Sequence, residues 1–365
     1  MSTSAQLARA AAYRAETAKT VSSGVTMVSA MWTKFFHARR SANGTKMTKT
    51  EFENLKGVEW NSAGQDDTNG DHRWPIEYQI PTATSNKGEL GTRSFQQFDP
   101  AKLAGIFYYS HEVTGAMSKR DLDLRKNDDT KMFDLEVQRD KGCEAALKTL
   151  FRKYIWNTTE TLQNGGLSHI VNTTNVSGTG TYAGLPMQTT SAYWTPGNYV
   201  YTAYTFTSNL MRVLSAGKIG LTRSDNAGGG NIIEPDFCCF SPAAWYNVLT
   251  FFEGKSTFAN AGNLGSPMMY AEGFQNIWFC GMDLFYDNWF GGSASGFIES
   301  AAAEEAVMGH SDKAWLRTTQ QQGEGLLRVL RENETPEVRG KVWVYETGMQ
   351  MLKFESPIWF GLLYL

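Results

Sequence analysis

The stretch of sequence that decides the fold is Asp236-Phe237-Cys238-Cys239-Phe240-Ser241-Pro242. A short apolar run between polar neighbours is typical of a strand that is buried on both faces. Ser241 is a favourable helix N-cap, and Pro242 suits the first helical position, where a backbone N–H is not needed. The stretch therefore predicts a buried strand, with both cysteines as buried thiols, that leads directly into a helix.

Downstream of this step, the sequence continues as a series of strands. Two apolar segments within residues 276–287 meet at Gly281 and are predicted to pair. The chain then reaches an apolar end, Ile358–Leu365, which has no polar tail. We expect it to be a core strand. Further strands are predicted within residues 297–308, 315–319, 326–330, 342–345 and 349–354.

The longest predicted helix lies upstream, over residues 127–157. Asp128 and Asp129 near its start and Arg152 and Lys153 near its end suit the helix dipole. About 29 residues at 1.5 Å each give a rod of roughly 43 Å, which is long for a globular helix.

A Gly-rich region, residues 158–204, follows this helix. Another helix is predicted over residues 206–216, and we expect it to end at Gly217 because glycine commonly follows the last helical residue.

Residues 74–98 are predicted to form a long hairpin. Apolar and polar residues alternate at its start, Thr82–Gly91 supplies turn residues, and Thr92–Phe98 is the return strand. A lone hairpin is marginally stable in water, so we expect it to lie on a neighbouring subunit. The side chains expected at that contact are Trp74, Ile76, Tyr78, Ile80, Arg93, Phe95 and Phe98. A single strand over residues 103–114 is predicted next.

The N-terminal region is basic. Residues 1–50 hold eight Lys and Arg against one acid, Glu16, whereas the whole chain has a net charge of −3. Helices are predicted within residues 3–20 and 25–38. A basic arm on an acidic body indicates a polyanion or an acidic partner surface, and a solubilising tail is the alternative. The residues expected to face a polyanion are Arg9, Arg14, Lys19, Lys34, Arg39 and Arg40.

Signatures of catalysis are missing from the sequence. The five His are scattered, and the four Cys do not make a disulfide framework. The Gly254-Lys255-Ser256 triplet lacks the earlier glycine of a phosphate-binding loop. No apolar stretch is long enough to span a membrane. We therefore expect no enzyme activity, no cofactor, no metal and no membrane partner.

In order along the chain, these features are a basic helical arm, a long hairpin, a strand, a very long helix, a Gly-rich region and a terminal set of strands. This order resembles the major capsid proteins of tailed bacteriophages, which have the Hong Kong 97-type coat fold. The likeness spans about residues 1–365. Local stretches that resemble steps of that fold are residues 166–171, 184–186, 236–242, 277–284 and 356–361.

The resemblance implies an α+β fold in four parts. An N-terminal arm would take residues 1–65, and an extended β-hairpin loop residues 66–100. A peripheral domain with a spine helix, Asp128–Trp156, would take residues 101–225 and be completed by 345–365. An axial domain would take residues 226–344.

The resemblance also implies a structural function. The chain would assemble with itself into the hexamers and pentamers of an icosahedral shell and enclose double-stranded DNA without sequence specificity. Assembly in the host bacterial cytoplasm would place it in the virion capsid, with scaffolding, portal and cement proteins as further candidate partners. An encapsulin-like shell around protein cargo is one alternative. A cytosolic α/β enzyme with an unrecognised site is the other.

Overall fold

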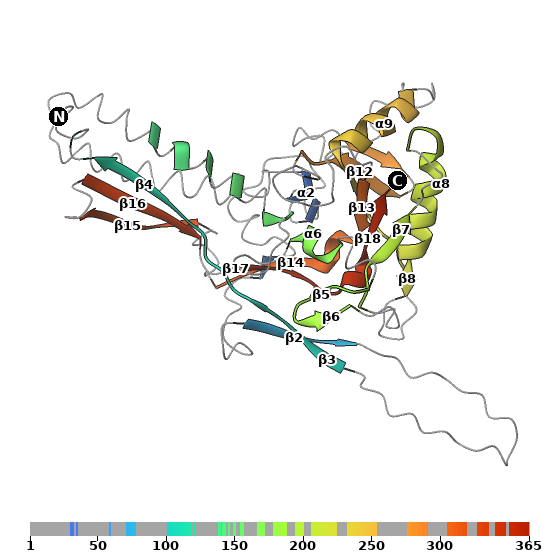
Figure 1. Cartoon of the computed structure of the whole chain (residues 1–365), viewed down its shortest axis with the longest axis horizontal. Helices are drawn as coiled ribbons and strands as arrows, with labels where there is room; N and C mark the ends of the chain where they lie inside the picture. The colour runs from blue at the N-terminus through green and yellow to red at the C-terminus, as the bar shows by residue number, and fades with distance from the viewer. Residues whose placement is uncertain are drawn as a thin grey trace, which may run out of the picture.

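The computed structural model shows a mixed α+β chain, whose elements are labelled in Figure 1. The described residues are 30–32, 34–35, 58–59, 71–77, 101–118, 120, 138–139, 141–143, 145–146, 149–150, 154–156, 166–171, 178–187, 194–200, 206–224, 232–253, 276–279, 281–288, 290, 305–319, 327–335, 340–347 and 350–364.

A six-stranded mixed sheet lies at the centre of this fold, with the strand order β11-β12-β10-β13-β18-β7 (Figure 1). Strand β10 pairs parallel with β12 and antiparallel with β13. Strand β18 pairs antiparallel with β13 and parallel with β7. The strands are β7 (Gly197–Val200), β10 (Phe237–Phe240), β11 (Asn276–Phe279), β12 (Met282–Tyr286), β13 (Glu305–Gly309) and β18 (Phe360–Tyr364).

The buried strand predicted from residues 236–240 is confirmed as β10, whose four side chains are all buried. Phe237 and Cys239 belong to one apolar cluster, and Cys238 and Phe240 belong to another. Because both faces of β10 are covered, every position needs an apolar side chain, which explains the continuous apolar run. Burial also raises the pKa of both thiols well above the ordinary value, so they stay protonated and unreactive.

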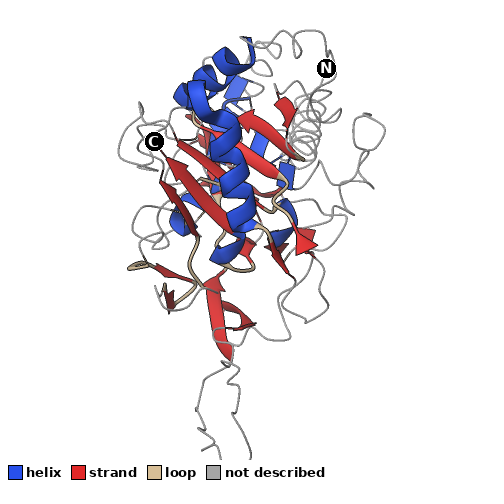
Figure 2. Cartoon of the chain, turned by 90° about the vertical axis from the view of Figure 1, so that its right-hand side faces the viewer, coloured by secondary structure: helices blue, strands red, loops and turns tan. Residues whose placement is uncertain are grey.

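Two helices cover the face of the sheet that carries Cys238 and Phe240. Helix α8 (Phe206–Leu221) lies in front of the strands in Figure 2 and packs on β13, β18 and β7. Helix α9 (Pro242–Glu253) packs on α8, β10 and β12. Together with the sheet they enclose an apolar cluster that includes Leu210, Leu214 and Trp245.

The start of α9 is confirmed at the residue predicted. The Ser241 hydroxyl oxygen accepts the backbone N–H of Ala244 at 3.2 Å, as an N-cap does. The backbone N–H of Glu305 lies 3.5 Å from the same oxygen. The Ser241 side chain therefore also contacts the backbone of Glu305, the first residue of β13.

Substituting Ser241→Ala is expected to lower the free energy of unfolding by about 1 kcal/mol, because the Ala244 N–H loses its acceptor. Urea denaturation would measure the change. Thr250→Ala in the same helix is the matched control: the Thr250 hydroxyl contacts only the carbonyl of Tyr246 on an exposed face. Equal losses for the two variants would contradict the capping role.

The predicted end of α8 at Gly217 is wrong, since the helix continues to Leu221. A Cβ on Gly217 would lie 3.2 Å from both Leu363 Cδ2 and Met308 Cε. The glycine therefore lets the helix approach β13 and β18 closely and does not end it.

The strand pair around Gly281 and the buried C-terminal strand are both confirmed. Strands β11 and β12 pair antiparallel, and Gly281 between them has φ +78°. Strand β18 lies inside the central sheet with Leu362 and Leu363 fully buried, the first in one apolar cluster and the second in the other. The four-part division into arm, loop, peripheral and axial domains stays a prediction.

Smaller sheets extend from this centre. In Figure 1, the sheet β15-β16-β4 reaches away from the six-stranded sheet. It is made of β4 (Glu112–Ser118), β15 (Leu327–Thr335) and β16 (Gly340–Thr347). The sheet β1-β14-β17 combines β1 (Val58–Glu59), β14 (Ala314–Thr318) and β17 (Gln350–Phe354). The remaining short elements are α2 (Ala30–Trp32), α6 (Leu167–Ile170), β5 (Thr181–Tyr182), β6 (Leu185–Pro186), β8 (Arg223–Ser224), β9 (Ile232–Ile233), η3 (Ser311–Lys313) and η4 (Pro357–Trp359).

The hairpin region has a different pairing from the one expected. Strand β2 (Asp71–Glu77) pairs antiparallel with β3 (Ala101–Phe107). The single strand predicted over residues 103–114 is wrong, because β3 ends at Phe107 and β4 begins at Glu112. The predicted turn 82–91 and return strand 92–98 lie outside the described residues.

The long predicted helix is described only in parts. Residues 138–139, 141–143, 145–146, 149–150 and 154 are helical. The predicted C-terminal end of this helix at Trp156 is wrong, because Ile155 and Trp156 form a turn directly after the helical Tyr154. The predicted start at residues 127–128 lies outside the described residues. The helix predicted over 3–20 lies outside them too. Within the one predicted over 25–38, α2 and residues 34–35 are helical.

Candidate functional site

Three of the thirteen predicted site residues can be placed: Lys34 from the arm, and Trp74 and Ile76 from the hairpin. The others lie outside the described residues. They are Arg9, Arg14, Lys19, Arg39, Arg40, Tyr78, Ile80, Arg93, Phe95 and Phe98.

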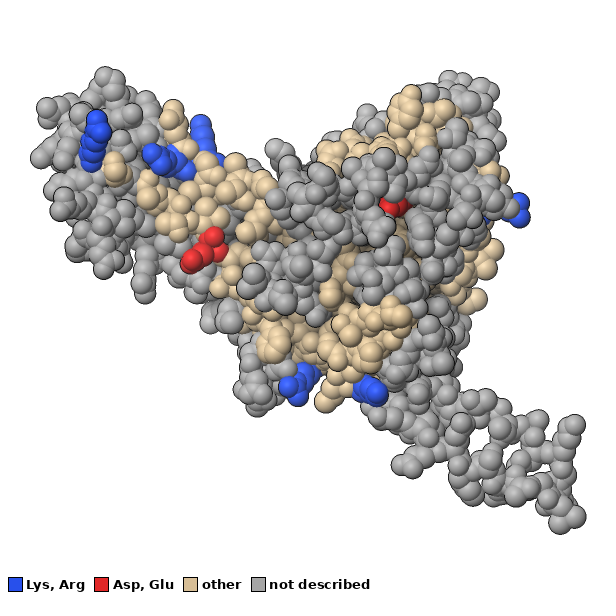
Figure 3. Space-filling view, viewed as in Figure 1, with Lys and Arg blue, Asp and Glu red and all other residues tan. Residues whose placement is uncertain are grey.

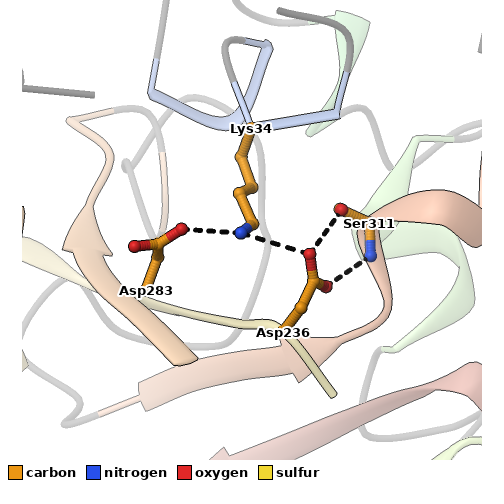
Figure 4. A network of polar contacts seen from close by, with 4 residues as sticks. All are labelled: Lys34, Asp236, Asp283 and Ser311. Carbon is orange, nitrogen blue, oxygen red and sulfur yellow. Dashed lines mark hydrogen bonds and ion pairs between the residues drawn. The ribbon is translucent and has the colours of Figure 1, made fainter. Parts of the chain in front are cut away.

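Lys34 does not face a polyanion, so this prediction is wrong. Its side chain is buried, and its Nζ lies 2.7 Å from Asp283 Oδ2 and 3.1 Å from Asp236 Oδ2 (Figure 4). Asp283 belongs to β12, and Asp236 directly precedes β10. A buried ammonium group needs counter-charges within the chain, and these two carboxylates supply them.

Ser311 completes the cluster. Its backbone N–H donates to Asp236 Oδ1 at 2.7 Å and its hydroxyl donates to Asp236 Oδ2 at 2.6 Å (Figure 4). Burial alone would raise the pKa of Asp236, but the Lys34 ammonium and the two Ser311 hydrogen bonds together hold it below its ordinary value. Burial alone would lower the pKa of Lys34, but the two carboxylates raise it. Both groups are therefore charged at neutral pH.

Trp74 and Ile76 do not face a neighbouring subunit, so this part of the hairpin prediction is also wrong. Both side chains are buried in the apolar cluster of their own chain. Trp74 Nε1 donates to the carbonyl of Glu355 at 3.1 Å, and Lys353 Nζ lies 4.8 Å from the centre of the Trp74 ring. The base of the hairpin thus packs on its own subunit, next to the strand β17.

Two large apolar side chains are exposed on the outer face of the β2–β3 pair, next to the exposed Arg73. Leu103 and Phe107 are 61% and 56% exposed, and opposite them across the pair lie Pro75 and Asp71. Large exposed side chains gathered on one face are typical of a contact surface. If the hairpin meets a neighbour at its base, it does so through these side chains and not through Trp74 and Ile76.

No continuous basic surface forms among the described residues on the face shown in Figure 3. The described Lys and Arg side chains lie there in small separate groups. In the described part of the chain, no group of three or more His, Cys, Asp or Glu side chains could hold a metal ion. No described helix is long and apolar enough to cross a membrane.

Two buried histidines make stability depend on pH. Burial lowers the pKa of His111 and of His310 below the ordinary 6.5. His310 Nε2 lies 3.2 Å from the carbonyl of Leu221, and its ring meets Trp359 edge to face at 5.0 Å. The neutral ring therefore fits this environment better than the charged one.

The free energy of unfolding is expected to fall as the pH drops from 7 to 5, because the unfolded chain binds protons at these two residues before the folded chain does. Each histidine can contribute at most about 1.4 kcal/mol per pH unit. Denaturation curves at pH 7, 6 and 5 would show the slope. The double variant His111→Gln and His310→Gln should flatten it; an unchanged slope would contradict the assignment.

Asp236 and Asp283 are not predicted from the sequence as partners of Lys34. One signal was present: Lys34 lies directly before Phe35 on an otherwise apolar stretch, where a lone charge needs a partner. The partners themselves could not be found, because 202 to 249 residues separate them from Lys34 in the chain (236 − 34 and 283 − 34).

No protein-family model matches the chain, and no curated protein matches it. Solved structures with a similar fold include one from Mycobacterium phage Ogopogo, which is 12% identical with a TM-score of 0.47 and covers 83% of this chain and 90% of its own. The capsid of Myoviridae phage XM1 is 10% identical with a TM-score of 0.44, covering 89% and 96%. The holo-SrpI encapsulin complex from Synechococcus elongatus PCC 7942 is 12% identical with a TM-score of 0.39, covering 84% of each. Further similar structures are the capsids of the cyanophages P-SCSP1u and Pam1.

Proposed function

We propose that this protein is the major capsid protein of a tailed phage, which assembles with itself into an icosahedral shell around double-stranded DNA. The observation that carries the proposal is the order of elements along the chain. A basic N-terminal region is followed by the strand pair β2–β3, a helical stretch and a mixed sheet. The late strand β18 completes this sheet.

The described surface supports an assembly function better than catalysis. The described chain holds no candidate metal cluster, and its two adjacent cysteines are buried and protonated. Large apolar side chains are exposed on several elements instead: Leu103, Phe107, Met211, Ile219, Ile232, Tyr246 and Trp278. A closed shell repeats the same contacts around every subunit and would cover such side chains.

Electron microscopy of the purified chain tests this function. Closed shells that contain nuclease-protected DNA would support it, and shells that contain protein cargo would support an encapsulin-like compartment instead. A monodisperse monomer of about 41 kDa under all assembly conditions would contradict both. The loop between β2 and β3 is proposed to lie on a neighbouring subunit of this shell.

Neutralising Arg9, Arg14, Arg39 and Arg40 together to Gln is expected to reduce DNA retention, because binding of phosphates by such an arm depends mainly on charge. The difference between the variant and the unaltered protein should shrink as the salt concentration rises, because salt weakens the phosphate contacts that only the unaltered arm makes. The amount of DNA per particle after nuclease treatment would measure this loss of retention.

The matched control removes four exposed charges elsewhere, at Arg73, Arg139, Lys141 and Arg212. Equal DNA retention in the arm variant and the unaltered protein would argue against an arm that binds DNA. Lys34 is left unaltered in both variants because it is buried.

A further inference from the structure

The N-terminal segment, defined here as residues 30–35, is held on the core by apolar contacts. Ala30, Met31 and Phe35 are buried. The ring of Phe35 meets Phe237 of β10 at 5.4 Å and Phe354 of β17 at 6.3 Å, both edge to face. The segment thus reaches two different sheets of its own chain.

The same segment carries Lys34, whose side chain is buried, and the socket for its ammonium group is formed by Asp236, Asp283 and Ser311. Asp236 and Asp283 are fixed relative to each other, because the N–H of Asp283 donates to the carbonyl of Asp236 at 3.0 Å. Ser311 of η3 holds the Asp236 carboxylate with two hydrogen bonds. None of these three contacts involves Lys34, and the two made by Ser311 are drawn in Figure 4. We therefore expect the socket to keep its shape when the lysine leaves.

We propose that Lys34 and its socket form a latch that fastens the N-terminal segment to the central sheet, and that the segment detaches as a unit when the ion pairs are lost while the sheet stays folded. The inference does not depend on the proposed shell function. Within the basic N-terminal region, the described residues 30–32 and 34–35 pack on the folded body.

Physical reasons favour local detachment. The segment contributes no strand to the sheet, whereas the sheet is held by its own ladders of hydrogen bonds. Elements with few such bonds open at lower free energy than core strands do. Removing Lys34 is strongly unfavourable, because the Asp283 carboxylate is buried and would stay there without compensation, whereas the Asp236 side chain is 40% exposed.

The pH dependence has a definite sign. The charged groups near the socket are Lys34, Asp236 and Asp283, with His310, Asp312 and Lys313 on the adjoining turn. Since the pKa of Asp236 is lowered, its contribution is complete above the ordinary carboxyl range and is lost as the pH falls through the lowered value. Since the pKa of Lys34 is raised, its contribution is complete below pH 10.5 and is lost as the pH rises through the raised value. The latch is therefore closed at neutral pH and opens in acid.

Hydrogen exchange on the full chain tests the latch. In Lys34→Met, the protection factors of the amides in residues 30–35 should fall at least about 100-fold at pH 7. Those of β13 and β18 should stay unchanged. Lys218→Met is the control: Lys218 pairs with Glu234 at 2.6 Å at the surface end of α8, and its loss should leave residues 30–35 protected.

A rescue variant separates charge from packing. Lys34→Met combined with Asp236→Asn and Asp283→Asn leaves no charge unpaired in the socket, so protection of residues 30–35 should recover at least about tenfold over the single variant. In the unaltered protein, acid should lower the protection factors of residues 30–35 before those of β13. The pH measurements on the unaltered protein test the proposal even if Lys34→Met does not fold. The latch is refuted if residues 30–35 and the sheet lose protection together in acid. It is also refuted if residues 30–35 are as well protected in Lys34→Met as in the unaltered protein.

Discussion

Deleting Leu362–Leu365 is expected to leave the protein insoluble. The deletion removes most of β18, which lies between β13 and β7 in the central sheet. Leu362 and Leu363 are fully buried, and each contributes roughly 1.5–3 kcal/mol through burial alone. β7 also loses its neighbour in the sheet. The total approaches the whole stability of an ordinary domain, 5–15 kcal/mol.

Single substitutions test the burial of β18 through a change in the free energy of unfolding. Leu362→Ala and Leu363→Ala are each expected to lower the free energy of unfolding by about 2–5 kcal/mol, because each opens a cavity. The two leucines belong to opposite apolar clusters, so both faces of the sheet are probed. Urea denaturation of the soluble subunit would measure the losses.

Ile219→Ala is the control for these variants, since Ile219 is 76% exposed and should change stability by no more than about 0.5 kcal/mol. A soluble, fully folded chain without the last four residues would show that β18 does not hold the sheet together.

The second large effect is expected at Gly309, the last residue of β13. A Cβ there would lie 2.5 Å from Phe360 Cδ1 and 3.1 Å from the Trp359 carbonyl oxygen. Phe360 is fully buried, and the Trp359 oxygen belongs to the backbone, so neither neighbour is the free end of a flexible side chain. Gly309→Ala should therefore lower the free energy of unfolding by about 1–3 kcal/mol through overpacking.

The matched glycine is Gly142, a helical residue with nothing within 4 Å of the position of an added Cβ. Gly142→Ala should raise stability by about 0.5–1 kcal/mol, because alanine loses less backbone freedom in a helix. Opposite signs for the two substitutions, measured by urea denaturation, are the expected result. A stabilising Gly309→Ala would show that β13 and β18 are less tightly packed than described.

Local sequence signals predicted the local elements well. Strand β10, the Ser241 cap, the turn at Gly281 and the apolar strand β18 all follow from residues that are neighbours in the chain. Gly217 shows the limit of such signals. The same residue type that ends many helices here permits close packing, and the decisive neighbours, Met308 and Leu363, lie far along the sequence.

The candidate site could not be predicted in the same way, because its contacts are long-range. Lys34 has the same charge as the other basic residues of the predicted arm, and only the positions of Asp236 and Asp283 show that this charge is neutralised inside the chain. Likewise, the strand pattern of residues 74–80 was visible, but not that β3 would be the partner and that Trp74 would reach Glu355.

The position of β18 has a consequence for synthesis on the ribosome. Of the six strands in the central sheet, β18 is made last, and β7 can join the sheet only through it. Between the end of β13 and the start of β18 lie 50 residues (360 − 309 − 1), which take roughly 3–10 s to translate. During that interval, the nascent chain presents the open edge of β13 to other strands, which invites wrong pairing. A binding chaperone would act best in this interval.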